Sequence, residues 1–319
     1  MHFLVTGGAG FIGSALANRL IADGHSVSVL DDLSNGEQQR LNPAITFVQG
    51  DIDNIPLLWS LLPEVDCVYH LAARVSVAQS ILHPRHYNRV NVGGTVSLME
   101  AMRDTGVRRV VFTSSGAVYG KQGRLPVRET DSPHPDSPYA VSKWSAEQYI
   151  HTIGELWGME TVALRIFNAY GPNQSLPMSH APVIPRFLQQ ALTGGSVVLF
   201  GQGEQTRDFV YVDDVVDGLV SSAIADAVNR GIINIGSGQE TSIRTLVSEI
   251  ERVTGQEINL ISNSSKRGGV PRLVADISRA KELLDFQPRI GLEEGLRLTL
   301  ARDGRFAPFD APAAAVESG

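Results

Sequence analysis

Tyr139 and Lys143 are the side chains of this 319-residue chain whose possible chemistry is easiest to interpret. They are four positions apart, so in a helix both lie on one face. A phenol with a pKa of about 10 is a weak base at neutral pH, but a neighbouring ammonium favours its ionised form. The pair could therefore remove the proton of a hydroxyl whose carbon gives up a hydride. The same spacing also occurs in ordinary surface helices, so the surrounding sequence must decide.

Glycines at positions 7, 10 and 13 form a turn between an apolar run and a helical pattern. At such a turn, backbone N–H groups and the positive end of the helix dipole bind pyrophosphate, and side chains would keep the phosphates away. For a glycine-rich segment taken alone, a purely structural turn is the alternative. We expect this segment to bind a dinucleotide through Gly7, Gly10, Phe11, Ile12 and Gly13.

Asp31 ends the second apolar run, about 20 residues after the glycine turn. A carboxylate there accepts hydrogen bonds from the adenosine ribose and repels a 2′-phosphate, so the sequence favours NAD over NADP. Without the glycine turn, Asp31 and Asp32 could equally well be charged residues of a solvent-exposed loop.

The first half of the chain alternates β-branched runs with helical patterns, which is typical of βαβ units. We predict strands over residues 3–6, 26–30, 45–49, 65–70, 109–114 and 161–166. We predict helices over residues 11–22, 55–62, 87–105 and 138–156. The predicted fold class is therefore α/β, with a doubly wound parallel sheet of the Rossmann type.

After Asn168 the chain is punctuated by Pro and Gly, with helices predicted over 183–192, 215–225, 242–253 and 292–301. These shorter elements predict a smaller mixed α/β lobe. We assign residues 1–167 to an NAD-binding domain and 168–304 mainly to a substrate lobe, some of whose strands and helices return to the first domain. Residues 305–319 have no periodic pattern and are expected to form a frayed tail.

The composition excludes several classes of partner. A net charge of −7 provides no broad basic field for nucleic acid or an anionic membrane surface. We find no secretory leader pattern and no run of about 20 apolar residues, so we expect a cytoplasmic protein. Cys67 is the single cysteine, so no disulfide can form within one chain. The histidines, including His134 and His180, have no metal-ligand spacing, so no metal is expected; His180 could line a sugar pocket.

These segments together resemble the extended short-chain dehydrogenases of the sugar-nucleotide epimerase/dehydratase family. The resemblance extends to about Pro288 and rests on segments 7–13, 31–36, 50–52 and 70–73, on Asn91 and on the pair Tyr139 and Lys143. It implies NAD as the cofactor and a nucleotide-linked sugar as the substrate. Beyond the glycine turn, the cofactor contacts that it implies are Asp31, Asp32, Asn35, Gly36, Asp51, Ile52, Leu71, Ala72, Ala73, Asn91, Ser114, Tyr139, Lys143 and Phe167.

Segment 113–120 is similar to the serine-rich segment of this family. The resemblance makes Ser115 the hydroxyl that bridges Tyr139 and the reacting oxygen, so the expected catalytic set is Ser115, Tyr139 and Lys143. Ser114 would instead support the nicotinamide side. Taken alone, either serine would suit a strand-end cap as well as a catalytic role.

Gly116 and Ala117 follow Ser115, where related dehydratases and the decarboxylase have Asp or Glu. Neither residue can exchange a proton, so dehydration and decarboxylation lack a participant. We therefore expect 4-epimerisation of a UDP-hexose through a transient 4-keto sugar. UDP-glucose and UDP-galactose are the default pair, and N-acetyl and uronic acid forms stay open. The alternatives are another sugar-nucleotide enzyme (dehydratase, reductase or decarboxylase) and a non-catalytic NAD-binding module.

A sugar that must turn over in its pocket is best anchored through its nucleotide diphosphate. The resemblance places Asn168 and Arg207 at the diphosphate and residues 198–200 at the uracil ring. As alternatives, Asn168 could form a turn and Arg207 could pair with Asp208. The expected substrate contacts are Arg74, Ser76, Ser115, Tyr139, Asn168, Val183, Val198, Leu199, Phe200, Arg207, Lys266, Arg267 and Leu273.

Segment 266–273 departs from the usual Arg-x-Gly-Asp pattern of the family. Lys266 stands at the arginine and Gly269 at the nucleotide-binding aspartate, and Arg267 could replace the arginine by a shift of one residue. Leu273 aligns with a tyrosine that excludes N-acetylated sugars in some epimerases, so we hypothesise a roomier sugar pocket. The family also dimerises through helices that correspond to residues 87–105 and 138–156, so a homodimer is expected.

Overall fold

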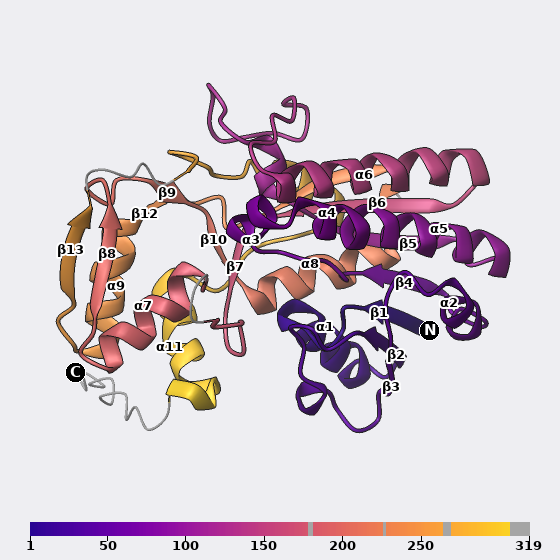
Figure 1. The fold of residues 1–319 in the computed structure, drawn as a ribbon, viewed down its shortest axis with the longest axis horizontal. Helices are drawn as coiled ribbons and strands as arrows, with labels where there is room; N and C mark the ends of the chain where they lie inside the picture. The colour runs from indigo at the N-terminus through magenta and orange to yellow at the C-terminus, as the bar shows by residue number, and fades with distance from the viewer. Residues whose placement is uncertain (178–180, 226–227, 264–268, 307–319) are drawn as a thin grey trace.

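A parallel sheet of seven strands forms the centre of the larger lobe (Figure 1). The computed structural model describes residues 1–177, 181–225, 228–263 and 269–306. The strand order is β11-β6-β5-β4-β1-β2-β3, the doubly wound order with β11 added at one edge. The strands are β1 (His2–Thr6), β2 (Ser26–Asp31), β3 (Thr46–Gln49), β4 (Cys67–His70), β5 (Arg109–Ser115), β6 (Glu160–Ile166) and β11 (Gly231–Ile235).

Helices cover both faces of this sheet, because successive strand residues are apolar and point to opposite sides. Phe3 and Val5 of β1 pack into one layer, and Leu4 between them packs into the other. The first layer contains α1 (Phe11–Ala22), α8 (Val212–Ile224) and α10 (Ser278–Leu284). The second contains α2 (Ile55–Leu61), α5 (Gly94–Thr105) and α6 (Pro138–Trp157). The predicted fold class is confirmed.

The strands predicted for the first half are all present, with ends shifted by no more than two residues. The segment predicted as one helix over 87–105 is helical throughout, but it is not a regular α-helix along its whole length. The segment forms α4 (Pro84–Tyr87), a π-helical turn η2 (Asn88–Gly93) and then α5. A π-helical turn keeps the apolar spacing close to that of a helix, so the pattern does not reveal it. A short helix α3 (Val77–Leu82), capped by Ser76, was not predicted.

The smaller lobe lies at the opposite end of the molecule from α5 (Figure 1). A parallel pair of strands, β8 (Ser196–Phe200) and β13 (Asn259–Asn263), lies at its outer edge (Figure 1). Three amphipathic helices form its core: α7 (Val183–Leu192), α9 (Ile243–Thr254) and α11 (Leu292–Arg302). Two short strand pairs link it to the larger lobe: β7 (Asn168–Tyr170) with β10 (Phe209–Tyr211), and β9 (Thr206–Arg207) with β12 (Thr241–Ser242).

Part of the chain after residue 168 returns to the larger lobe, since α8, β11 and α10 pack on its sheet. The expected tail does not begin at Arg305. Arg305 and Phe306 belong to the short helix η5 (Gly304–Phe306), and Phe306 is buried in the core of the smaller lobe. Residues 307–319 lie outside the described part of the chain. Among the described helices, none combines the length and the apolar character needed to cross a membrane.

Candidate active site

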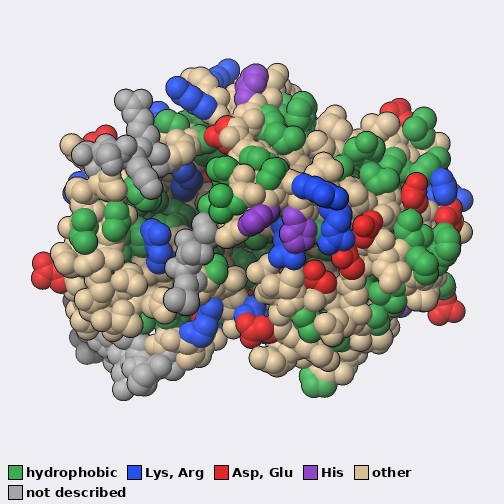
Figure 2. All heavy atoms as spheres, in the orientation of Figure 1, with side chains coloured by type: hydrophobic (Ala, Val, Ile, Leu, Met, Phe, Trp, Pro, Cys, Tyr) green, Lys and Arg blue, Asp and Glu red, His purple; other side chains and the backbone are tan. Residues whose placement is uncertain are grey.

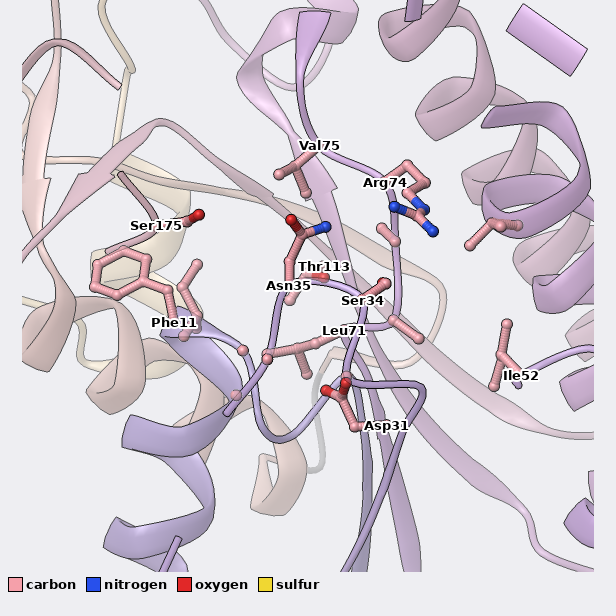
Figure 3. A pocket seen from close by; sticks show the side chains of 18 of the residues that line it. Phe11, Asp31, Ser34, Asn35, Ile52, Leu71, Arg74, Val75, Thr113 and Ser175 are labelled. Atoms are coloured by element: carbon pink, nitrogen blue, oxygen red, sulfur yellow. The ribbon is translucent and has the colours of Figure 1, made fainter. Parts of the chain in front are cut away.

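A cavity of about 400 Å³ lies at the carboxyl ends of β1, β2, β4, β5 and β6. Ligand sites of doubly wound folds form at this edge of the sheet. In Figure 3, Phe11 and Ser175 lie on one side of the cavity, Arg74 and Ile52 lie on the other, and Asn35 lies between them. The predicted cofactor residues that line it are Gly7, Gly10, Phe11, Ile12, Gly13, Asp31, Asp32, Asn35, Gly36, Asp51, Ile52, Leu71, Ala72, Ala73, Ser114, Tyr139, Lys143 and Phe167.

The glycines of the turn have different roles. A Cβ on Gly7, whose φ is +70°, would lie 2.6 Å from the backbone nitrogen of Ala72. A Cβ on Gly13 would lie 2.2 Å from the carbonyl oxygen of Gly7. The packing of the chain itself therefore requires both glycines. A Cβ on Gly10 would meet only that carbonyl, at 3.2 Å, so Gly10 is the glycine that leaves room for a ligand. This corrects the expectation that all of them serve phosphate approach.

The N-terminus of α1 faces the cavity at Phe11 and Ile12. Gly10 precedes the helix, and no side chain of the described residues caps it. The first N–H groups of α1 are thus left for a ligand, and the positive end of the helix dipole favours an anion. A pyrophosphate fits both requirements.

Asp31 is buried at the end of β2, with 7% of its surface exposed. Its Oδ2 accepts a hydrogen bond from the N–H of Ala9 at 3.0 Å, and its Oδ1 accepts one from the N–H of Leu33 at 2.8 Å. Burial raises the pKa of Asp31, although these N–H groups act in the opposite direction. Each oxygen keeps a second lone pair for the cavity, which suits the hydroxyls of a ribose.

Asp51 and Arg74 lie on the same side of the cavity, where the family resemblance places the adenine, at Asp51 and Ile52. Burial alone would raise the pKa of Asp51, but the N–H of Asp53, the guanidinium of Arg89 at 3.1 Å and the nearby charge of Arg74 lower it. Arg74 was predicted to contact the sugar. Arg74 lines the cavity close enough to Asp51 for its charge to lower the pKa of that carboxyl, so it lies towards the expected adenine end.

Basic and histidine side chains gather over α3 and α4, near the middle of the face in Figure 2, next to acidic ones. Arg85 and His86 lie on α4, and Arg89 follows in η2. Desolvation, together with the charges of Arg74 and Arg89, lowers the pKa of His86. Arg89 is paired with Asp51 at 3.1 Å and with Asp53 at 3.7 Å, so part of this positive charge is neutralised by the neighbouring carboxylates.

Asn91 and Ser76 lie behind the cavity wall, not on it. The side chain of Asn91 accepts a hydrogen bond from the N–H of Arg74 and donates to its carbonyl and to Ser142. Ser76 caps α3, and its carbonyl accepts a hydrogen bond from Tyr87. The predicted ligand contacts of Asn91 and Ser76 are therefore replaced by roles in shaping the wall, since their polar groups are occupied by the chain itself.

Tyr139 is the second residue of α6, one turn before Lys143, and both side chains line the cavity with Ser115. Burial raises the pKa of the Tyr139 phenol, and its hydrogen bond with the Ser115 hydroxyl acts in the opposite direction. The ring of Tyr87 stands edge-on to that of Tyr139, with centroids 6.4 Å apart. The predicted catalytic residues thus meet at one place in the cavity.

Lys143 is almost completely buried, with its Nζ 4.6 Å from the centre of the Phe112 ring. Burial lowers the pKa of Lys143 to about 7, and the charge of Glu147 acts in the opposite direction. Nearby His70 has both ring nitrogens hydrogen-bonded to threonine hydroxyls. Burial and the charge of Lys143 lower the pKa of His70 to about 3, so the imidazole is neutral.

A buried ion pair behind these residues was missed by the sequence analysis. Arg165 of β6 contacts both carboxylate oxygens of Glu147 on α6, at 2.6 and 3.1 Å. Ser114 of β5 donates a third hydrogen bond to Glu147 at 2.7 Å. Glu147 lies four residues after Lys143, and this helical spacing was the feature of the sequence that could have pointed to a role for Glu147 beside the lysine. Thr113 also lines the cavity, and so do Gln174 and Ser175 of the loop 173–177.

The predicted substrate residues of the smaller lobe do not line this cavity. Asn168 has an exposed side chain and lies between two residues that do, Phe167 and Ala169. Val198 is 39% exposed, whereas Leu199 is 2% exposed and packs in the core of the lobe, so its side chain cannot face a uracil. Phe200 and Val183 are half-buried, and Leu273 is buried against Tyr119 and Phe167.

Arg207 lies in β9 next to the buried Asp208. Burial lowers the pKa of Arg207, and Asp136 acts in the opposite direction. The carboxylate of Asp208 accepts hydrogen bonds from Ser237, Gly238 and Ala275. These four contacts fill its acceptor sites, so the alternative in which Arg207 serves as the partner of Asp208 is not what the structure has.

Lys266, Arg267 and His180 lie outside the described residues. Gly269, which stands at the usual aspartate position, has a φ of +62°. This conformation favours glycine over aspartate, so the departure from the family pattern fits the local backbone. Within the described ranges, no group of three or more His, Cys, Asp or Glu side chains could hold a metal ion.

Comparisons with known proteins agree with this geometry. The model of the NAD dependent epimerase/dehydratase family matches residues 3–236. A UDP-glucose 4-epimerase from Mycolicibacterium smegmatis is 41% identical over 309 residues, which are 94% of this chain and 97% of that relative. The crystal structure of UDP-glucose 4-epimerase from Thermotoga maritima with UDP-glucose has a TM-score of 0.90 and 36% identity, and the match covers 95% of this chain and 98% of that one.

A second solved structure is similar to the same extent. It is the UDP-N-acetylglucosamine 4-epimerase from Methanobrevibacter ruminantium in complex with UDP-N-acetylmuramic acid. Its TM-score is 0.89 with 36% identity, and the match covers 94% of this chain and 97% of that one.

Proposed function

The chain belongs to the NAD dependent epimerase/dehydratase family, and from this premise we propose that it is an NAD-dependent 4-epimerase of a UDP-hexose. The observation that carries the proposal is the meeting of Tyr139, Ser115 and Lys143 in one dinucleotide-sized cavity. Gly116 and Ala117 follow Ser115 without an acid, which supports epimerisation over dehydration or decarboxylation.

The cavity residues fit NAD. The N–H groups of α1 and the open side of Gly10 would hold the pyrophosphate. Asp31 would bind the adenosine ribose, and Asp51 and Ile52 the adenine. Ser114, Tyr139, Lys143 and Phe167 would surround the nicotinamide end. When bound there, NAD supplies a reversible hydride acceptor.

Tyr139 acts as the base in our mechanism. Its phenolate takes the proton of the C4 hydroxyl as C4 loses its hydride, while Ser115 hydrogen-bonds the same sugar oxygen. The ammonium of Lys143 stabilises the phenolate, because an opposite charge nearby favours the ionised form. The 4-keto sugar then turns over in the cavity, and Tyr139 returns the proton once the hydride has been restored to the other face. No extra acid is required, which agrees with Gly116 and Ala117.

The smaller lobe anchors the part of the substrate that does not react. We assign the diphosphate to Asn168 and Arg207 and the uracil to the segment of Val198 and Phe200, where the backbone of Leu199 takes part. Binding energy at these groups leaves the sugar free to rotate. We keep UDP-glucose and UDP-galactose as the default pair. Leu273 makes N-acetylated sugars a second option, and failure to turn over UDP-N-acetylglucosamine would refute the roomier pocket.

One experiment tests the proposal. The purified protein is incubated separately with UDP-glucose, UDP-galactose, UDP-N-acetylglucosamine and UDP-glucuronate, without added reductant, and the products are identified by NMR. We expect one C4 epimer pair to interconvert to a mixture. A new sugar skeleton would support a dehydratase or decarboxylase instead. If no substrate reacts while NAD is bound, the epimerase assignment falls.

We also propose a homodimer formed through α5 and α6. Tyr149 and Leu156 of α6 are 47% and 73% exposed and seven residues apart, so they share one face of the helix. Ile81 and Leu82 of the adjacent α3 are 64% exposed, which extends the apolar surface. Sedimentation of the wild type and of a Tyr149→Glu variant tests this, since the variant should be monomeric.

We propose a cytoplasmic location, which fractionation of cells would test.

A further inference from the structure

The buried pair Glu147 and Arg165 is not used by the mechanism above. Glu147 is 0% exposed and Arg165 is 2% exposed. The planar guanidinium contacts Oε1 and Oε2 of Glu147 through two nitrogens. In this geometry both carboxylate oxygens act as hydrogen-bond acceptors. Any further group that bonds to Glu147 must therefore donate.

Ser114 is that further group, and its hydrogen bond has a fixed direction. Its Oγ lies 2.7 Å from Oε2 of Glu147, so the hydroxyl proton points away from the cavity. Ser114 also lines the cavity at the predicted nicotinamide end. Its only remaining capacity on that side is to accept, through the oxygen lone pairs. A ligand donor such as a carboxamide N–H suits this acceptor.

Lys143 has Glu147 as its counter-charge. The two residues are one helical turn apart on α6, and the charge of Glu147 favours the ammonium. The other titratable groups around Lys143 are Tyr139 on α6 and the neutral His70 on β4. Tyr119, Arg165 and His151 surround Glu147 at greater depth. Among the described residues, Glu147 thus supplies the negative charge that acts on this lysine.

We propose that Glu147, held in place by Arg165, is a positioning residue for the reaction: it fixes the Ser114 hydroxyl as an acceptor towards the nicotinamide end and supplies the negative charge beside Lys143. The inference rests on the proposed function for the identity of the cofactor and for the role of Lys143. An ion pair with only a structural role would not need to contact Ser114 at the cavity wall. It would also not need to lie one helical turn after Lys143. Apolar residues could replace such a pair.

Ser114 variants test the acceptor. The dissociation constant of NAD is measured by calorimetry without any sugar, so the result does not depend on turnover. Ser114→Ala should weaken NAD binding about tenfold, and Ser114→Thr, which keeps the hydroxyl, should restore it. Ser222→Ala is the matched control, because Ser222 is buried and donates to the carbonyl of Leu219 away from the cavity. Unchanged NAD affinity in Ser114→Ala would overturn this part of the proposal.

Glu147→Gln tests the charge. Without the carboxylate, Lys143 loses its proton at lower pH, so the alkaline limb of the kcat/KM profile should move to lower pH by about one unit. Glu155→Gln is the control, because Glu155 lies on the same helix in an exposed pair with Arg230. A limb that stays in place in folded Glu147→Gln would overturn the proposal. If that variant does not fold, the Ser114→Ala and Ser114→Thr titrations decide the proposal, because both variants leave the Glu147 and Arg165 charges in place.

The proposed function and this inference can fail separately. If the wild type turns over no UDP-hexose, the epimerase assignment fails, and the pH dependence of NAD affinity replaces that of kcat/KM. For the inference to stand in that case, Ser114→Ala must weaken NAD binding, and Glu147→Gln must shift the pH dependence of NAD affinity.

Discussion

The ring of Phe167 lies across Gly116: a Cβ on that glycine would be 3.2 Å from three ring carbons. Phe167 itself is held between the cavity and Tyr119, with ring centroids 6.2 Å apart. The position after Ser115 therefore has no room for a side chain unless Phe167 moves. The absence of an acid at this position is built into the packing of the cavity floor.

We expect Gly116→Asp to lose epimerase activity without gaining dehydratase activity. The new side chain displaces Phe167, and a shift of about 1 Å next to the reacting groups can cost on the order of 100-fold in rate. NMR of the products with the preferred UDP-hexose measures both activities. Gly123→Asp is the control, because a Cβ on Gly123 meets nothing within 4 Å. A dehydrated product from Gly116→Asp would contradict this account.

Tyr139→Phe should reduce kcat by about 100- to 10,000-fold, the range expected when a general base is removed. The ring stays in place, so NAD binding and the unfolding midpoint should stay close to those of the wild type. Tyr149→Phe on the same helix is the control, since the Tyr149 ring is exposed and outside the cavity. A Tyr139→Phe variant with wild-type kcat would show that another group is the base.

The cofactor half of the site could be predicted because its signals are local. Gly10 and Asp31 are fixed by a strand, a turn and a helix that follow one another directly, and all of these elements are present. The pair Tyr139 and Lys143 could be placed in the same way, because four residues of helix bring the side chains together.

The rest of the site depends on contacts between distant segments. Glu147 meets Ser114 and Arg165 across three elements, and no motif announces that contact. Arg74 was expected at the sugar but lies towards Asp51. The direction of a side chain after β4 cannot be read from a sequence. Asn91 was assigned to the cofactor, but its amide is used by the backbone of Arg74. Each error concerns where a side chain points, which tertiary packing decides.

Replacement of Lys143 by Met should raise stability while it removes activity. The folded protein lowers the pKa of Lys143 from 10.5 to about 7 through burial. Between these values the unfolded chain binds more protons, so Lys143 lowers the stability near neutral pH, and this cost shrinks as the pH rises towards 10.5. We expect Lys143→Met to gain on the order of 1–3 kcal/mol at about pH 7 and less at about pH 9.

Urea unfolding of Lys143→Met and of the wild type at both pH values measures this difference. Lys121→Met is the comparison, because Lys121 is exposed and its change should alter stability little at either pH. A gain that is equal at the two pH values would mean that the effect is apolar packing and not relief of a buried charge.

Asp31→Asn should weaken NAD binding about tenfold and reduce the preference for NAD over NADP. The amide can accept only one of the hydrogen bonds from Ala9 and Leu33, and it no longer repels a 2′-phosphate. Calorimetric titration with both cofactors measures the two effects. Asp32→Asn should have a smaller effect, because Asp32 is a loop residue whose carboxylate accepts from the N–H of Ser34. Equal losses in the two variants would contradict the special role of Asp31.

Arg207→Met should raise the KM for the UDP-hexose about 10- to 100-fold, with a smaller change in kcat. The reason is that Arg207 is assigned to the diphosphate, which is bound equally in the ground state and the transition state. Its half-buried position strengthens such a contact, since fewer waters compete for the phosphate oxygens than at an exposed side chain. Arg244→Met is the matched control, because Arg244 lies in the same lobe with an exposed hydrogen bond to the carbonyl of Gln202.

Steady-state kinetics and NAD titration of Arg207→Met separate the possible outcomes. If KM and NAD affinity both stay at wild-type values, Arg207 does not bind the substrate, and if the unfolding midpoint falls together with kcat, its role is to support the lobe.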